Sequence, residues 1–128
     1  MQNDLFSSQE IIPNEKTWYL IGKDTKGKIR VVIISYELQK DEKDNRWFVI
    51  HRSSGQLHGK QTKQPDKIVE RGKATRNLWE QVMLEAKHLV KEKLDKGYKE
   101  FNTNPESVPD ELLYDVMLKF KNDYFLNV

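Results

Sequence analysis

Halfway along the chain the spacing of the apolar residues changes, and this change limits the folds that are possible. The first half holds short runs rich in β-branched and aromatic residues, such as KTWYLIG at 16–22 and IRVVIISYEL at 29–38. Such runs are typical of β-strands. From Leu78 to Lys96 the apolar residues instead recur every three or four positions, which indicates an amphipathic helix. The chain is therefore expected to form a sheet with a helix packed on it.

The first half predicts an antiparallel meander. After the turn KDTKGK and the charged connection QKDEKDN, a third strand is expected in RWFVIHR at 46–52. A turn at Gly55 is followed by QLHGKQTK, a candidate fourth strand, and DKIVER after Pro65 is a short candidate fifth strand. Residues 1–15 show little periodicity and are expected to form a flexible N-terminal arm.

The second half predicts two helices. Asn77 is expected to cap the first and Gly97 to end it, and its buried stripe is Leu78, Val82, Met83, Ala86, Leu89, Val90 and Leu94. The second is expected in PDELLYDVMLKFKND at 109–123, where a proline and two acids suit a first turn. The predicted fold is α+β, a small antiparallel sheet of four to five strands with one long helix packed on it and a second C-terminal helix.

Composition excludes several kinds of chemistry. A chain of 128 residues is about one domain, and without cysteine it has no disulfide, thiol nucleophile or cysteine-based zinc site. His51, His58 and His88 complete no metal-binding motif, and no phosphate-binding glycine loop or GxSxG is present. We expect no metal, no cofactor and no catalysis by this chain. No apolar run nears the roughly 18 residues of a membrane span and no leader is evident, so a cytoplasmic protein with no membrane partner is predicted.

The charges are distributed unevenly, although the formal net charge is only +2. Between Arg52 and Arg76 there are seven Lys or Arg and two acids, a net charge of +5, whereas Glu100 to Val128 has two bases and six acids, a net charge of −4. The middle of the chain is therefore expected to meet an anionic partner. Its cations alternate with Ser, Gln and Gly, which suits phosphate oxygens. The alternative is an ordinary charged surface.

Several short motifs in this order resemble the WGR-type module, in particular the diverged version that precedes the catalytic domain in some phage and bacterial ATP-dependent DNA ligases. The resemblance covers residues 16–101, which we take as one domain, followed by a C-terminal helix and tail at 102–128. The matching motifs are S-G-x-L-x-G-K at 54–60, G-K at 72–73, E-Q at 80–81 with L-E-A at 84–86, and D-K-G-Y at 95–98.

The resemblance implies a non-catalytic accessory module of DNA replication or repair that binds nicked or broken duplex, either free-standing or as the N-terminal domain of a ligase. The WGR domains of poly(ADP-ribose) polymerases carry Trp-Gly-Arg where this chain has Ser54, Gly55 and Gln56, so only the glycine is kept. The expected phosphate contacts are Arg52, Lys60, Lys63, Lys73 and Arg76, with Ser54, Gly55 and Gln56 allowing close backbone approach. Trp18, Trp47, Trp79 and Tyr98 are expected to pack in the core.

Two further segments suggest protein partners. QNDLF at 2–6 is similar to the pentapeptide by which bacterial and phage replication proteins dock on the sliding clamp, which implies that Gln2, Leu5 and Phe6 bind a clamp. The alternative function is a protein-interaction module or inhibitor that uses the acidic C-terminal helix. Its exposed apolar residues would then include Leu112, Met117, Phe120, Tyr124 and Phe125.

Overall fold

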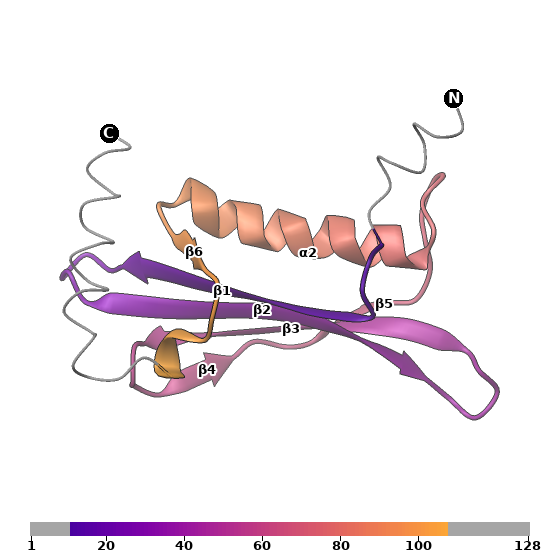
Figure 1. Ribbon diagram of the computed structural model, residues 1–128, viewed down its shortest axis with the longest axis horizontal. Helices are drawn as coiled ribbons and strands as arrows, with labels where there is room; N and C mark the ends of the chain where they lie inside the picture. Colours follow the sequence, from indigo (N-terminus) through magenta and orange to yellow (C-terminus); the bar gives the residue numbers. More distant parts are fainter. Residues whose placement is uncertain (1–10, 108–128) are drawn as a thin grey trace.

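A computed structural model of the protein describes residues 11–107. In this range six strands form one antiparallel sheet in the order β4-β3-β2-β1-β6, and β5 also pairs with β3. One helix, α2, lies across one face of the sheet, and a 3-10 turn, η1, follows β6 (Figure 1). The elements are β1 Glu15–Lys23, β2 Ile29–Lys40, β3 Arg46–Gln56, β4 Gln61–Lys63, β5 Lys67–Val69, α2 Leu78–Asp95, β6 Lys99–Phe101 and η1 Pro105–Ser107.

The two long hairpins are closed by turns of one design. In each turn an aspartate side chain, Asp24 or Asp41, accepts hydrogen bonds from two backbone N–H groups further along the loop. Each turn then contains a residue in the left-handed region, Gly27 at φ 80° and Asp44 at φ 64°. These are the residue types that tolerate a positive φ, so the sequence DxxG or DxxD specifies both turns.

The core lies between α2 and the sheet. Alternate residues of the three long strands meet Val82, Ala86 and Val90 of the helix, and all of these side chains are buried. The sheet contributes Trp18, Leu20, Val32, Ile34, Tyr36, Phe48, Ile50 and Val69. Aromatic rings continue the packing, since Phe48 makes edge contacts with Tyr36 and Trp79 at ring-centre distances of 5.3 and 5.6 Å. Trp18 and Trp79 therefore pack as expected.

Both ends of α2 agree with the expectation from sequence. The Asn77 side chain accepts from the Glu80 N–H at 2.8 Å and the Glu80 side chain accepts from the Asn77 N–H at 2.8 Å, which is a capping box. Gly97 follows the helix with φ 98°, and the Tyr98 N–H donates back to the Lys93 carbonyl. Within the predicted apolar stripe only Leu94 is wrong, because its side chain is 41% exposed.

The α+β class and the long helix on an antiparallel sheet are confirmed, while three details differ. Strand β6 was not expected, and it brings the sheet to six strands. Strand β3 continues through Gly55 to Gln56, so the predicted turn at Gly55 is wrong. The last residues of the predicted N-terminal arm contact the core, since the Pro13 carbonyl accepts from the Tyr36 hydroxyl and Asn14 accepts from the Trp79 indole. The predicted helix at 109–123 lies outside the described residues.

None of the helices in residues 11–107 is long and apolar enough to cross a membrane.

Candidate nucleic-acid interface

The cations predicted to bind phosphate lie along the outer edge of β3. Strand β4 covers residues 53–55 of that edge and β5 covers residues 48–50, and the loop at 70–77 continues from β5 to α2. We call this border, with its seven bases, the cationic edge. Its members are Arg52, Lys60, Lys63, Lys67, Arg71, Lys73 and Arg76.

The predicted residues do not share one face of the sheet. Arg52 of β3 lies opposite Ile34 of β2, whose side chain faces the helix, so the Arg52 side chain is on that face too. Lys63 of β4 lies opposite Ser53 of β3, and both of these side chains are on the other face. Lys60 follows the β3–β4 turn at one end of the sheet, and Lys73 precedes α2 at the other end (Figure 1). The paired centres of β4 and β5 are five residues apart along β3, which is about 16 Å. What the residues have in common is the edge.

Four of these cations are already engaged within the protein. The Arg52 Nη2 donates to the Pro65 carbonyl at 3.3 Å, and Lys63 lies 3.4 Å from the Asp66 carboxylate. Lys67 pairs with Glu85 at 2.8 Å, and the Arg76 Nε donates to Gln81 at 2.9 Å. Among the described residues, the side chains of Lys60 and Arg71 form no hydrogen bond or ion pair, and the side chain of Lys73 interacts only through its charge, with Glu85. Lys60, Arg71 and Lys73 are thus the cations most available to a ligand.

A buried polar chain holds the 70–77 loop against the helix. Gln81 is only 3% exposed and links Arg76 to Glu85, because its amide oxygen accepts from Arg76 and its amide nitrogen donates to Glu85 at 2.7 Å. Burial raises the pKa of Glu85, but hydrogen bonds from Lys67 and Gln81 outweigh it, so the net shift of this pKa is downward. The E-Q motif therefore caps and anchors the helix, a role that its position in the sequence did not reveal.

His51 lies between two carboxylates on the face opposite the helix. Its Nδ1 is 3.0 Å from Asp66 and its Nε2 is 3.5 Å from Glu37, and the hydrogen bond from His51 lowers the pKa of Asp66. His58 pairs elsewhere, with Glu106, so the two histidines do not face each other. Within residues 11–107, no group of three potential ligands is arranged to hold a metal ion.

The glycines of the β3–β4 hairpin do not act as the sequence suggested. The left-handed residue of this turn is His58, at φ 61°, and not Gly55 or Gly59. Gly55 is needed for a close approach, since a Cβ atom there would lie 2.3 Å from the Lys60 carbonyl oxygen. Ser54 pairs with Thr62, and the Gln56 carbonyl accepts from the Gly59 N–H, so these residues build the hairpin.

Gly55→Ala should lower the free energy of unfolding by about 2 kcal/mol, because the new methyl group overlaps a backbone atom that cannot turn away. Gly59→Ala is the matched control in the same turn. Its nearest neighbours would lie at 3.3 Å, both in exposed Gln56, so a change within about 0.5 kcal/mol is expected. Urea unfolding followed by tryptophan fluorescence measures both. Equal losses in the two variants would show that the Gly55 approach is not what closes the hairpin.

The remaining residues of the motifs also support the fold. A Cβ on Gly72 would lie 1.9 Å from the Arg76 carbonyl oxygen, so this glycine lets the loop cross itself. Tyr98 packs on Gly22, where a Cβ would lie 2.7 Å from the ring, which agrees with the core position expected for Tyr98. Leu57 packs on the second core cluster, with Ile21 and Ile29. The motif glycines and apolar residues therefore specify the scaffold, whereas the side chains of the motif lysines Lys60 and Lys73 form no hydrogen bond or ion pair with a described residue.

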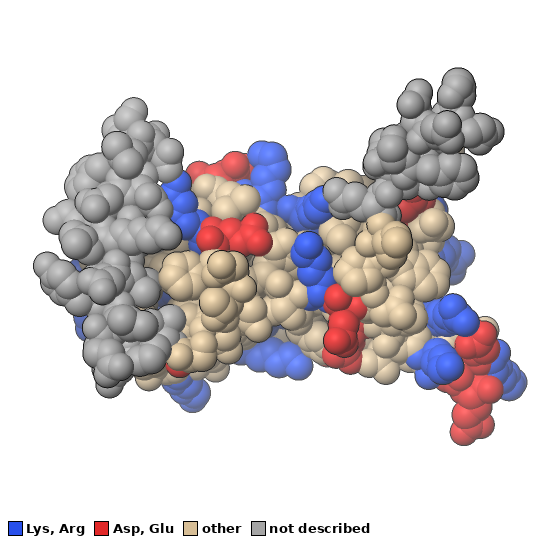
Figure 2. Space-filling model, viewed as in Figure 1, with Lys and Arg blue, Asp and Glu red and all other residues tan. Residues whose placement is uncertain are grey.

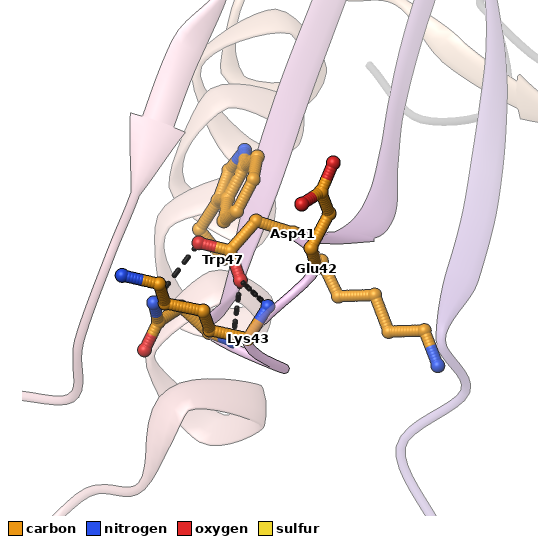
Figure 3. Close-up of a pocket in the computed structure, with 6 residues that line it drawn as sticks. Asp41, Glu42, Lys43 and Trp47 are labelled. Carbon is orange, nitrogen blue, oxygen red and sulfur yellow. Dashed lines mark hydrogen bonds between the residues drawn. The ribbon is translucent and has the colours of Figure 1, made fainter.

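The tip of the β2–β3 hairpin offers a contrasting charged surface. Figure 2 shows positive and negative side chains mixed at this tip, at the lower right, and its residues 40–46 comprise three bases and three acids. A shallow hollow there is lined by Lys40, Asp41, Glu42, Lys43, Asn45 and Trp47 (Figure 3). The Asp41 carboxylate accepts from the Asn45 side chain at 2.9 Å, and this bond with those from the backbone lowers its pKa. That carboxylate serves the turn, and the charges of the tip cancel.

Trp47 was expected to pack in the core, as Trp18 and Trp79 do, but it is not part of the core cluster. It is only partly buried, and it lines hollows on both of its sides, one against the β2–β3 turn and one against Ile68 and Glu70. Gln2, Leu5 and Phe6, which were predicted to bind a clamp, lie outside the described residues.

Comparison with known proteins gives no relative, since no protein-family model, curated protein or solved structure matches this chain.

Proposed function

We propose that this protein is a non-catalytic DNA-binding module of replication or repair, which contacts the phosphate backbone of nicked or broken duplex along the cationic edge. The observation that carries the proposal is the collection of seven bases against two acids, from residue 52 to 76, on one border of the sheet. Cations that replace condensed counterions on phosphate supply most of the affinity of such proteins.

The arrangement suits a long ligand better than a small one. The available lysines, Lys60 and Lys73, lie beyond the two ends of a stretch of about 16 Å, a length that corresponds to about five nucleotide steps of one strand. The β4 and β5 segments lie between them, where Lys63 and Lys67 are held by acids that a polyanion can replace as partners. The edge offers cationic side chains, which bind phosphate oxygens. We therefore expect the protein to contact the DNA backbone and not to recognise the base sequence.

Fluorescence anisotropy with labelled nicked, blunt-ended and intact duplexes of equal length tests the function. At about 50 mM salt we expect binding to all three, tightest to the nicked or blunt duplex, with affinity that falls steeply as salt is added. A protein that leaves the anisotropy of every duplex unchanged at this salt concentration has no DNA-binding function of the kind proposed.

A further inference from the structure

The β3–β4 turn directs several hydrogen-bond donors at one carboxylate. The Glu106 Oε2 accepts from the His58 N–H at 2.8 Å and lies 3.1 Å from the His58 Nδ1. The Glu106 Oε1 lies 3.5 Å from the Gln61 Nε2. Glu106 belongs to η1, which is 48 residues further along the chain than His58, so the fold brings it to this turn and local sequence does not.

The backbone of His58 adopts an unusual conformation. Its φ of 61° is a conformation that side-chain-bearing residues seldom adopt, and the glycine that would adopt it freely is one position later. Such residues persist where surrounding contacts fix them, and they occur often in ligand-binding turns. Here the strained residue presents its N–H and its imidazole to the same oxygen.

These donors are those that a phosphate group requires. A backbone N–H, an imidazole and a side-chain amide converge on two carboxylate oxygens, and the same turn carries the Lys60 ammonium, which has no partner among the described residues. Carboxylate and phosphate oxygens accept hydrogen bonds in the same way, and a phosphate adds charge for Lys60. The Gln61 Nε2 also donates to the Gln56 carbonyl at 3.2 Å, which holds this partly buried amide group within the turn.

We infer that the β3–β4 turn is an anion-binding site for a phosphate group and that Glu106 occupies it in the free protein. The inference deepens the proposed function and rests on it for the source of the phosphate, which is the DNA backbone. Duplex must then displace the Glu106 carboxylate to reach His58 and Gln61, so this residue lowers the affinity of the module for DNA.

Glu106→Gln tests the inference, because it keeps the shape of the side chain and removes its charge. We expect it to bind nicked duplex about fivefold more tightly than the unaltered protein at ~50 mM salt. A partly exposed ion pair contributes a free energy that corresponds to an affinity change of about this size, and the variant no longer has to break it. Glu100→Gln is the matched control. It removes the same charge from β6, and the Glu100 side chain forms no hydrogen bond or ion pair with a described residue. An equal gain in both variants, or no gain in Glu106→Gln, would overturn the inference while leaving DNA binding in place.

A second measurement keeps the anion site separate from the DNA-binding function. Inorganic phosphate is added to the 15N-labelled full chain while the His58 amide resonance is followed. A saturable shift is expected in Glu106→Gln and a much weaker one in the unaltered protein. If this shift appears although no variant binds duplex, the anion site stands and the proposed function fails. If the His58 resonance does not respond in Glu106→Gln, the anion site is wrong whatever the duplex experiment shows.

Discussion

Replacing Phe48 by alanine is expected to lower the free energy of unfolding by about 4 kcal/mol, since loss of a buried phenyl ring removes its transfer free energy and leaves a cavity. Phe48 is 0% exposed and packs between Tyr36 and Trp79, so no neighbouring side chain can easily fill the space. Equilibrium unfolding in urea, followed by circular dichroism, measures the change. Phe48 lies on β3, which also pairs with β4 and β5.

Ile68→Ala is the control for this prediction. Ile68 lies on β5 beside Phe48's strand but is 49% exposed, so its truncation should cost less than about 1 kcal/mol. Similar losses in the two variants would contradict a core that lies between α2 and the sheet and would place the main apolar packing on the opposite face.

The double variant Lys60→Ala/Lys73→Ala is expected to bind nicked duplex on the order of 100-fold more weakly at ~50 mM salt, about tenfold for each released counterion. The side chains of these two lysines form no hydrogen bond or ion pair with a described residue, so their removal should leave the stability within about 0.5 kcal/mol of the unaltered protein. Anisotropy gives the affinity and urea unfolding the stability. A loss of affinity that accompanies unfolding would instead reflect damage to the fold.

Lys40→Ala/Lys43→Ala is the matched control, with the same loss of charge. Both lysines lie at the tip of the β2–β3 hairpin, where acids balance bases, and this tip is not part of the cationic edge. We expect a reduction of no more than about threefold, from the general loss of positive charge. Equal reductions in the two double variants would mean that the net charge of the protein governs binding and that the edge has no special role.

Much of the fold could be predicted because local patterns agree with the tertiary structure. The strands at the centre of the sheet have β-branched and aromatic runs, and α2 has both a capping residue and a helical stripe. Strand β6 was missed because three residues, KEF, carry no alternation of their own. It forms because Gly97 reverses the chain after the helix and Tyr98 then packs on Gly22 beside β1.

The candidate site was less predictable, because what decides it is contact between distant segments. Sequence showed that the segment from Arg52 to Arg76 is basic, and the sheet does place it on one border. It did not show that Glu85 pairs with Lys67, or that Glu106 reaches His58. The ion pair of Lys63 with Asp66 is local and could have been expected from their spacing of three residues. The role of Gly55 was misassigned because a glycine needed for close approach looks in sequence like a turn glycine.

The salt dependence of binding to nicked duplex tests the central claim most directly. The logarithm of the association constant is measured against the logarithm of salt concentration for the unaltered protein and the two double variants. Lys60→Ala/Lys73→Ala should reduce the magnitude of the slope by about 1.8, or ~0.9 for each phosphate that is no longer neutralised, while Lys40→Ala/Lys43→Ala should leave the slope unchanged. Three parallel lines would contradict phosphate binding along the cationic edge.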